Sequence, residues 1–367
     1  MTNSDIKKLK VLTIVGARPQ IIKSASLSRA IKTKFSSNIS EVLVHTGQHY
    51  DDNLSASLFR ELGISQPKYN LGINKLSHGA MTGRMIEQLE QVCMSENPDW
   101  IIVYGDTNST LAGAIVASKL NIKIAHVEAG LRSLNTSMPE EVNRILTDRV
   151  SSLLFCPDEV AVKNLFSEGY NNFSNVSIKN VGDIMYENAL YFSEQSKKPS
   201  VLFNLEKNNF LLATIHRAEI VKSRDKLTSV ISALNIISES TKVIAPFHPR
   251  TIKSIKKYKI ETNFNIIPPV SYLEMLWLID NSKVVLTDSG GVQKEAFFFK
   301  KVSIITREET EWVNLVKSGN CTLVGYDTNK IISEFNKTEN FKPGPNLFGD
   351  GNTSEQIIHS IINYSKT

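Results

Sequence analysis

The stretch WIIVYGDTNSTLAGAIVASKL, residues 100–120, changes character once. Its first six residues are almost continuously apolar, which is typical of a parallel strand covered on both faces. The remainder is small and hydroxyl-rich at first and then apolar at helical spacing, which predicts a helix. Asp106 lies at the junction, directly after the strand. A strand followed at once by a helix indicates an α/β unit, and an acid at a strand end is a candidate for chemistry.

The same alternation of apolar runs and amphipathic helical stretches continues along the chain. Because the runs are apolar on both faces, they favour parallel strands covered by helices on both sides. The sequence therefore predicts an α/β fold of two Rossmann-like, doubly wound parallel-sheet domains facing a cleft, which is the expected active site. The predicted strands cover residues 11–16, 41–46, 100–105, 122–127, 152–157, 210–215, 242–247, 264–269, 283–288 and 302–307.

The length of 367 residues also favours two domains, because a single core rarely grows that large. A stretch rich in Gly, Asn and Ser at 170–182 interrupts the helical pattern. We therefore expect an N-terminal domain over residues 1–178 and a C-terminal domain over residues 179–352.

Composition argues against several classes of protein. Hydrophobic residues make up 41% of the chain and the charge is mixed, as in ordinary globular proteins. The net charge of +5 and the pI near 8.9 suit an anionic small molecule, and no clustered basic face favours nucleic acid. Three separated cysteines give neither zinc-type pairing nor a disulfide framework. A polar N-terminus and the lack of an apolar run of about 20 residues predict a cytoplasmic protein without membrane insertion.

Acidic residues gather after two predicted strands and at the start of a following helix, at Asp106, Glu128, Glu140 and Glu141. Hard divalent cations prefer such carboxylates, so a metal site is one interpretation. Several arginines within residues 132–149 accompany the acids, which is more typical of an internally paired polar cleft. Asp106 can also cap the helix behind it, and capping and catalysis are compatible.

Two strand-to-helix turns are candidate anion sites. After the first predicted strand, Arg18 and Lys23 accompany a helix start whose backbone N–H groups can bind an anion, although an exposed basic turn explains them equally well. In the second turn, Ser289 can cap a helix while Gly290 and Gly291 let the backbone approach a diphosphate closely.

Glu295 lies about one helical turn beyond this glycine pair. A carboxylate there can accept both hydroxyls of a ribose. The agreement between the glycines and the acid favours this interpretation over that of a solvated helix residue.

Two histidines follow predicted strands, each with an arginine close behind. His216 precedes Arg217, and His248 lies two residues before Arg250. Two such pairings in one domain favour anion contact or proton transfer. The histidines at 45, 126 and 359 lack this context and are interpreted as structural or surface residues.

Taken together, the motifs resemble one family, the non-hydrolysing UDP-N-acetylglucosamine 2-epimerases. The resemblance covers essentially the whole chain and follows the order of the motifs. It rests on VGARPQIIK (15–23), HTGQHYD (45–51), YGDTNSTLAGA (104–114), AHVEAGLRS (125–133), MPEEVNRILTD (138–148), IHRAE (215–219), HPRT (248–251), LTDSGGVQKEA (286–296) and REETEW (307–312).

The resemblance implies a two-domain fold similar to that of GT-B glycosyltransferases, with UDP bound by the C-terminal domain. A final helix over residues 353–367 is expected to pack back on the N-terminal domain. It also implies a reaction without redox cofactor or metal, in which UDP is eliminated to give a 2-acetamidoglucal and then adds back with C2 inverted. The partners implied are a UDP-sugar substrate and a second copy of the chain in a homodimer.

By the same resemblance, Asp106, Glu128 and Glu140 handle protons and stabilise the intermediate, and His216 is the essential histidine near the pyrophosphate. The groups expected to bind the substrate are Arg18, Lys23, His248, Arg250, Ser289, Gly290, Gly291 and Glu295.

Two positions depart from the family pattern. Gln20 stands where the first loop commonly has glutamate. Residues 310–314 read TEWVN where the enzymes acting on UDP-GlcNAc usually read TERPE, and this resembles the branch acting on UDP-2,3-diacetamido-2,3-dideoxy-glucuronate, for surface polysaccharide biosynthesis. Trp312 either helps to admit a 3-acetamido group or packs in the core of the second domain. The substrate is therefore UDP-GlcNAc, converted to UDP-ManNAc, or this derivative.

Three other functions remain open on the sequence. A hydrolysing 2-epimerase would release UDP and free sugar, and a GT-B glycosyltransferase would need an acceptor groove instead of acids at C2. A non-catalytic UDP-sugar sensor is disfavoured by the placed acids and by His216.

Overall fold

The computed structural model describes residues 8–48, 52–202 and 205–366, and the chain divides into two compact units. Unit 1 runs to Asn188 and takes up the chain again from Leu347, and unit 2 is Ala189–Asn346. The last residues of the quoted HTGQHYD motif, 49–51, lie outside the described residues. The domain boundary expected after residue 178 falls within strand β7, Ser177–Asn180.

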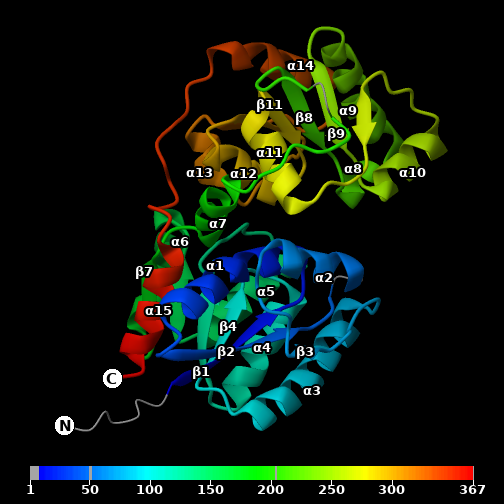
Figure 1. The fold of residues 1–367 in the computed structure, drawn as a ribbon. Helices are drawn as coiled ribbons and strands as arrows, with labels where there is room; N and C mark the ends of the chain where they lie inside the picture. The colour runs from blue at the N-terminus through cyan, green and yellow to red at the C-terminus, as the bar shows by residue number, and fades with distance from the viewer. Residues whose placement is uncertain (1–7, 49–51, 203–204, 367) are drawn as a thin grey trace. The chain divides into compact units, whose positions relative to one another are not determined.

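The described part of unit 1 contains a seven-stranded, wholly parallel sheet in the order β3-β2-β1-β4-β5-β6-β7 (Figure 1). Its central strands are buried, as the nearly unbroken apolar runs predict. The strands are β1 (Leu9–Val15), β2 (Ile39–His45), β3 (Tyr69–Asn70), β4 (Trp100–Tyr104), β5 (Lys123–Val127), β6 (Leu153–Cys156) and β7 (Ser177–Asn180).

Helices connect these strands and cover the sheet (Figure 1). The final helix, α15, belongs to this unit and packs on α1, with Ile357, Ile358 and Ile361 buried. The helices are α1 (Arg18–Lys34), α2 (Asp52–Glu61), α3 (His78–Glu96), α4 (Asn108–Lys119), α5 (Pro139–Val150), α6 (Glu159–Ser167), η1 (Tyr170–Asn172), α7 (Ile184–Ser193, which crosses into unit 2) and α15 (Thr353–Tyr364).

The described part of unit 2 repeats this plan with a six-stranded parallel sheet in the order β10-β9-β8-β11-β12-β13. Its strands are β8 (Phe210–Thr214), β9 (Lys242–Pro246), β10 (Asn265–Ile267), β11 (Val284–Thr287), β12 (Val302–Ile305) and β13 (Cys321–Leu323). Its helices are α8 (Ala218–Val221), α9 (Arg224–Ser238), α10 (Pro249–Tyr258), α11 (Tyr272–Asn281), α12 (Gly290–Phe298), α13 (Val313–Lys317), α14 (Thr328–Lys337) and η2 (Thr338–Asn340).

The predicted fold class, two doubly wound parallel sheets, is confirmed. Every apolar run predicted as a strand contains one. The strands β3, β7 and β13 were not predicted, and each lies at an edge of its sheet. Edge strands are short and partly exposed, so their sequences lack the apolar run that marks a central strand.

One buried amide joins three elements at the start of α1. Gln20 Oε1 accepts hydrogen bonds from the backbone N–H groups of Gly16 (2.9 Å) and Ala17 (3.1 Å), which close the turn after β1. Its Nε2 donates to the carbonyl oxygen of Tyr104 and to Thr110 Oγ1, both at 2.9 Å. The end of β4 and the start of α4 are thus tied to α1. An amide suits this place because it has both an acceptor and donors.

Gln20→Glu is expected to lower the free energy of unfolding by about 1–3 kcal/mol at neutral pH, because a carboxylate cannot donate to the Tyr104 carbonyl. The loss should shrink as the pH falls, since a protonated carboxyl group regains a donor. Urea unfolding between about pH 4 and pH 8 measures this dependence. Gln20→Met is the matched control, because methionine has a similar volume and no group that titrates. Equal, pH-independent losses in the two variants would contradict the assignment.

Candidate active site

Several predicted site residues follow the strands between which the strand order of each sheet reverses. In unit 1 the reversal falls between β1 and β4, which are followed by Arg18 and Asp106 respectively. In unit 2 it falls between β8 and β11, which are followed by His216 and Asp288. Loops diverge at such a switch point and leave a crevice at the carboxyl ends of the strands, where open α/β sheets bind ligands.

A buried ion pair lies at the switch point of unit 1. Lys23 on α1 pairs with Glu128, which directly follows β5, and both side chains are nearly inaccessible to solvent. Gly105 lies against this pair: a Cβ there would be 3.1 Å from Lys23 Nζ and 3.3 Å from Glu128 Oε1, and its φ is +63°. Glu128 also has a positive φ of 72°, which is uncommon for a residue with a side chain and is concentrated at functional sites.

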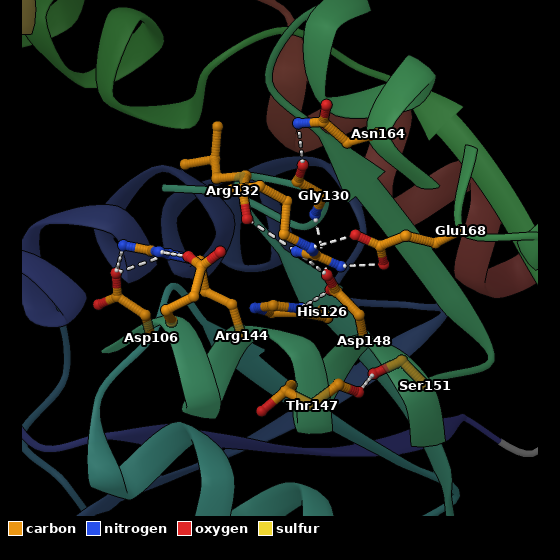
Figure 2. Close-up of polar contacts among 12 residues, drawn as sticks. Asp106, His126, Gly130, Arg132, Arg144, Thr147, Asp148, Ser151, Asn164 and Glu168 are labelled. Atoms are coloured by element: carbon orange, nitrogen blue, oxygen red, sulfur yellow. Dashed lines mark hydrogen bonds and ion pairs between the residues drawn. The ribbon is translucent and has the colours of Figure 1, made fainter. Parts of the chain in front are cut away.

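Asp106 is held by an arginine that it shares with a second acid (Figure 2). Arg144 Nε donates to Asp106 Oδ2 at 3.0 Å, and Arg144 Nη2 lies 2.8 Å from the same oxygen. Arg144 Nη1 donates to the buried carboxylate of Glu141, which also accepts from the backbone N–H groups of Ser133 (2.9 Å) and Leu134 (3.0 Å). Glu141 therefore anchors both the loop before α5 and the arginine that orients Asp106.

The two acids differ in the direction of their pKa shifts. Burial raises the pKa of Asp106 above its ordinary value, and the positive charges of Arg144 and Lys23 offset this only in part. Burial also acts to raise the pKa of Glu141, but the two backbone hydrogen bonds and Arg144 outweigh it and hold that pKa below its ordinary value. Asp106 is therefore the easier of the two to protonate, as a group that exchanges protons requires.

Glu140 and Arg18 lie in the first turns of α5 and α1, and both are exposed. The charge of Glu140 raises the pKa of Asp106, so the two carboxylates are close enough to interact. Unit 1 thus brings Asp106, Glu128, Glu140 and Lys23 to one edge of its sheet, as the spacing of the motifs predicts.

In unit 2, Asp288 organises the turn that carries His216. Asp288 Oδ2 accepts from the backbone N–H groups of His216 and Arg217, both at 2.8 Å, and Oδ1 lies 2.8 Å from His216 Nδ1. Asp288 is fully buried, whereas the His216 side chain is 51% exposed. The carboxylate favours the proton on Nδ1, so Nε2 is the nitrogen presented to a ligand.

His248 is the N-cap of α10, and its Nδ1 accepts from the backbone N–H of Arg250 at 3.2 Å. Burial lowers the pKa of His248, and the positive charges of Arg250 and His216 lower it further. The His248 ring is therefore a neutral imidazole beside an exposed arginine, which suits hydrogen bonding more than charge pairing.

The glycine turn of unit 2 begins α12, where Ser289 Oγ accepts from Val292 N at 3.4 Å. A Cβ on Gly290 would collide with Glu311 Oε1, whereas one on Gly291 would meet little. A side chain at Gly290 would thus have to displace Glu311, and Gly291 leaves the approach to the helix N-terminus open. Glu295 follows on the same helix and is buried.

Trp312 packs inside unit 2, which was one of its two predicted roles. Its side chain is 4% exposed, and Lys294 Nζ lies 4.2 Å from the centre of its ring. The indole Nε1 would be 3.3 Å from a Cβ on Gly290, so the ring supports the start of α12. We therefore expect any effect of Trp312 on a bound ligand to act through the turn at Gly290 and Gly291.

Sequence reasoning did not find the partners that orient these groups. From the sequence, Arg144 is expected only as one of several arginines paired with the acids, Asp288 only as a helix cap, and His126 as a structural or surface residue. Among the described residues, no grouping of three or more His, Cys, Asp or Glu is suited to hold a metal ion. No helix in the described part of the chain is long and apolar enough to cross a membrane.

Asp106→Asn is expected to raise the thermal midpoint at neutral pH relative to the wild type. The pKa of Asp106 is raised in the folded state, so its contribution to stability is full below the unfolded pKa and is lost as the pH rises through the folded pKa. The asparagine variant lacks this loss, and each unit of pKa difference corresponds to about 1.4 kcal/mol. Calorimetry between about pH 4 and pH 7.5 should show a gap that widens with pH. A gap that narrows as the pH rises would refute the direction assigned to this pKa.

Comparisons with known proteins agree with this geometry. Residues 31–362 match the family described as UDP-N-acetylglucosamine 2-epimerase. The UDP-2,3-diacetamido-2,3-dideoxy-D-glucuronate 2-epimerase of Pseudomonas aeruginosa is 48% identical over 96% of this chain and 99% of its own length. The solved structure of the UDP-GlcNAc 2-epimerase of Methanocaldococcus jannaschii, in complex with UDP-GlcNAc and UDP, is 39% identical with a TM-score of 0.85 and covers 97% of this chain and 99% of that chain.

The fold is also similar to that of Phytolacca americana UGT2, solved with UDP-2fluoro-glucose and pterostilbene. That similarity has a TM-score of 0.56 at 11% identity, covers 98% of this chain and 94% of that one, and concerns the GT-B-like fold alone. The family resemblance drawn from the motifs is confirmed by the family match and by the identity to the Pseudomonas relative. The chain belongs to the UDP-N-acetylglucosamine 2-epimerase family and is an isomerase, a UDP-sugar 2-epimerase.

Proposed function

We propose that the chain inverts C2 of a UDP-linked N-acetylhexosamine without net hydrolysis, by elimination and re-addition of UDP. The observation that carries the proposal is that unit 1 brings Asp106, Glu128 and Glu140 to one edge of its sheet, with Asp106 held by Arg144 and Glu128 by Lys23. Inversion at carbon needs a base on one face and an acid on the other, so more than one carboxylate is required. An acid that is easily protonated, next to others, meets that requirement.

In the proposed reaction a carboxylate removes the C2 proton, and the electrons of the C–H bond form a double bond between C1 and C2. The C1–O bond breaks at the same time, and UDP leaves with its electron pair. UDP then adds back to C1 of the 2-acetamidoglucal while a proton is delivered to the opposite face of C2. We assign proton transfer to Asp106, Glu128 and Glu140. Lys23 orients Glu128 through their buried pair.

The C2 proton is only weakly acidic, so departure of the diphosphate needs strong stabilisation. We assign that task to the N-terminus of α12 at Ser289, Gly290 and Gly291, where backbone N–H groups and the helix dipole favour an anion. Asp288 orients His216 so that Nε2 faces the diphosphate. Arg18, His248 and Arg250 complete the polar contacts, and Glu295 accepts the ribose hydroxyls.

For the substrate, we propose UDP-2,3-diacetamido-2,3-dideoxy-glucuronate in preference to UDP-GlcNAc. The Pseudomonas relative, at 48% identity, bears the former name, whereas the Methanocaldococcus structure holds UDP-GlcNAc. The product would then serve surface polysaccharide biosynthesis. A cytoplasmic location agrees with three cysteines that are free and buried.

We also propose a homodimer formed through α5. Val142, Leu146 and Val150 recur every four residues along this helix, and all three are exposed. Such a stripe is apolar surface that association would remove from water.

Incubation of each UDP-sugar with the enzyme in D2O tests the reaction and the substrate together. We expect deuterium at C2 in both epimers with the UDP linkage intact, and faster exchange with the diacetamido derivative. Asp106→Asn should slow exchange by about 10²–10⁴-fold, as loss of a general acid–base group does, while UDP binding by calorimetry persists. Net release of free sugar would indicate a hydrolysing enzyme, and absence of exchange in the wild type would refute the proposal. Faster exchange with UDP-GlcNAc would reverse the substrate assignment alone.

Leu146→Asp is expected to convert the homodimer to monomers, because a charge would be buried at the interface. Sedimentation velocity at micromolar concentration measures the change. Ile236→Asp on α9 is the matched control, because Ile236 is 46% exposed and Leu146 is 47% exposed. A monomeric wild type, or dissociation by both variants alike, would count against the α5 interface.

A further inference from the structure

His126 lies on β5, two residues before Glu128, and is completely buried. Both nitrogens of its ring have close polar neighbours from different parts of unit 1. Nδ1 lies 2.6 Å from Asp148 Oδ1 on α5 (Figure 2). Nε2 lies 2.7 Å from the carbonyl oxygen of Gly105, in the turn after β4. The ring therefore spans the space between α5 and the turn that carries Asp106.

The geometry fixes the protons on this ring. A carbonyl oxygen only accepts hydrogen bonds, so Nε2 must donate to Gly105. The second oxygen of Asp148 accepts from Gly130 N at 3.2 Å and lies 2.8 Å from Arg132 Nη1. Burial acts to raise the pKa of Asp148, but the His126 ring and Arg132 outweigh it and lower that pKa below its ordinary value. With the Gly130 N–H and Arg132 on its other oxygen, Asp148 is placed to accept from Nδ1, so both ring nitrogens donate.

This pair holds the turns on which both predicted acids stand. Gly105, fixed through its carbonyl oxygen by His126 and through its N–H by Val127 O at 2.9 Å, directly precedes Asp106. Gly105 also lies against the ion pair of Lys23 and Glu128. A shift of this glycine would therefore move Asp106 and disturb the support of Glu128 together.

Asp148 fixes the turn on the other side of Glu128. It accepts from the N–H of Gly130, two residues beyond Glu128, and it is itself held by Arg132. Arg132 is fixed in turn by Glu168, which accepts from its Nε at 2.6 Å and from its Nη2 at 2.8 Å (Figure 2). The charges thus form a connected chain from the buried Asp148 on α5 to Glu168, an exposed residue that follows α6.

Stability alone is a weak reason for such an arrangement. Burying two charges costs them their solvation, and well-packed apolar residues of similar volume often give a protein that is as stable or more stable. What apolar residues cannot do is fix a carbonyl oxygen and an N–H group in two separate turns at once. The pair of His126 and Asp148 contacts the turns at Gly105 and Gly130, next to Asp106 and Glu128, and can therefore fix both turns.

We propose that His126 is a positioning residue for the epimerisation: as a doubly protonated imidazole paired with Asp148, it holds the turns at Gly105 and Gly130 and so sets the positions of Asp106 and Glu128. The role of His126 rests on the proposed proton transfer at C2. In this proposal His126 does not contact the substrate, so replacing it should change the rate of the chemical step and not the binding of the substrate.

Two substitutions each keep one polar contact of the His126 ring and remove the other. In His126→Asn the amide nitrogen takes the place of Nδ1 and keeps the contact with Asp148, but nothing reaches Gly105. In His126→Gln the amide nitrogen takes the place of Nε2 and can donate to the Gly105 carbonyl. We expect kcat for C2 exchange to fall about 100-fold in the asparagine variant, as misplacement of a reacting group by about 1 Å does, and to recover at least about 10-fold in the glutamine variant. KM should stay within about threefold of wild type in both.

Leu154→Ala separates positioning from general destabilisation. Leu154 is buried on β6 and is the register partner of His126, so its truncation weakens the same part of the sheet without touching either turn. Its thermal midpoint should fall while kcat in the folded enzyme stays within about threefold of wild type. Equal losses of kcat in the asparagine and glutamine variants, a loss carried by KM, or a comparable loss in Leu154→Ala would overturn the proposal.

The protonation state is tested on the wild-type protein, which removes any dependence on a variant that fails to fold. Selective ¹⁵N labelling of the seven histidines and comparison with His126→Gln identifies the signals of His126. At neutral pH we expect both ring nitrogens to show the chemical shifts of a protonated imidazolium, and a neutral tautomer would overturn the assignment. If the wild type shows no C2 exchange, the proposed function fails. If the wild type exchanges and the asparagine variant matches it, only the role of His126 fails.

Discussion

The buried ion pair between Lys23 and Glu128 is the contact on which the arrangement of unit 1 depends. It brings the first helix to the end of β5, across the strand between them, and it packs closely against Gly105, where a Cβ would crowd both side chains. A charge buried alone at this place would be strongly destabilising, so each partner requires the other. The turn after β4, and with it Asp106, is shaped by this requirement. The identity of Gly105 follows from the ion pair above it as much as from its positive φ.

A second device recurs at the strand ends of both units. The side chains of Gln20, Glu141 and Asp288 each accept hydrogen bonds from two successive backbone N–H groups. Each pair of N–H groups belongs to a turn and has no partner within a helix or sheet, so the side chain supplies the acceptor. The three side chains come from the next helix, from α5 and from the end of β11. The turns around the candidate site are therefore set by side chains rather than by backbone propensity alone.

This explains how far the sequence could be interpreted. The central strands were predictable because burial on both faces leaves a continuous apolar run, whereas β7, with the sequence SIKN, is half exposed and carries no such signal. The candidate residues were predictable because they follow strands directly. Their partners were not, since the pairing of Asp106 with Arg144 depends on how α5 crosses the sheet, and no spacing in the motif reveals that crossing. His126 is interpreted from the sequence as a structural or surface residue because the groups that it contacts, Asp148 and Gly105, each lie about twenty residues away along the chain.

The roles of the acids in unit 1 follow from how their surroundings separate them. Glu141 and Asp148 are buried with several donors each, and their pKa values are lowered. They are permanent anions whose work is to hold Arg144, Arg132 and the neighbouring turns. Asp106 shares Arg144 with Glu141, yet it receives too little compensation for its own burial, and its pKa is raised. Because Glu141 already engages the same guanidinium, Arg144 can orient Asp106 without fully stabilising its charge. One arginine thus fixes a scaffold acid and leaves its neighbour able to exchange a proton, which is the division of labour that catalysis by paired carboxylates requires.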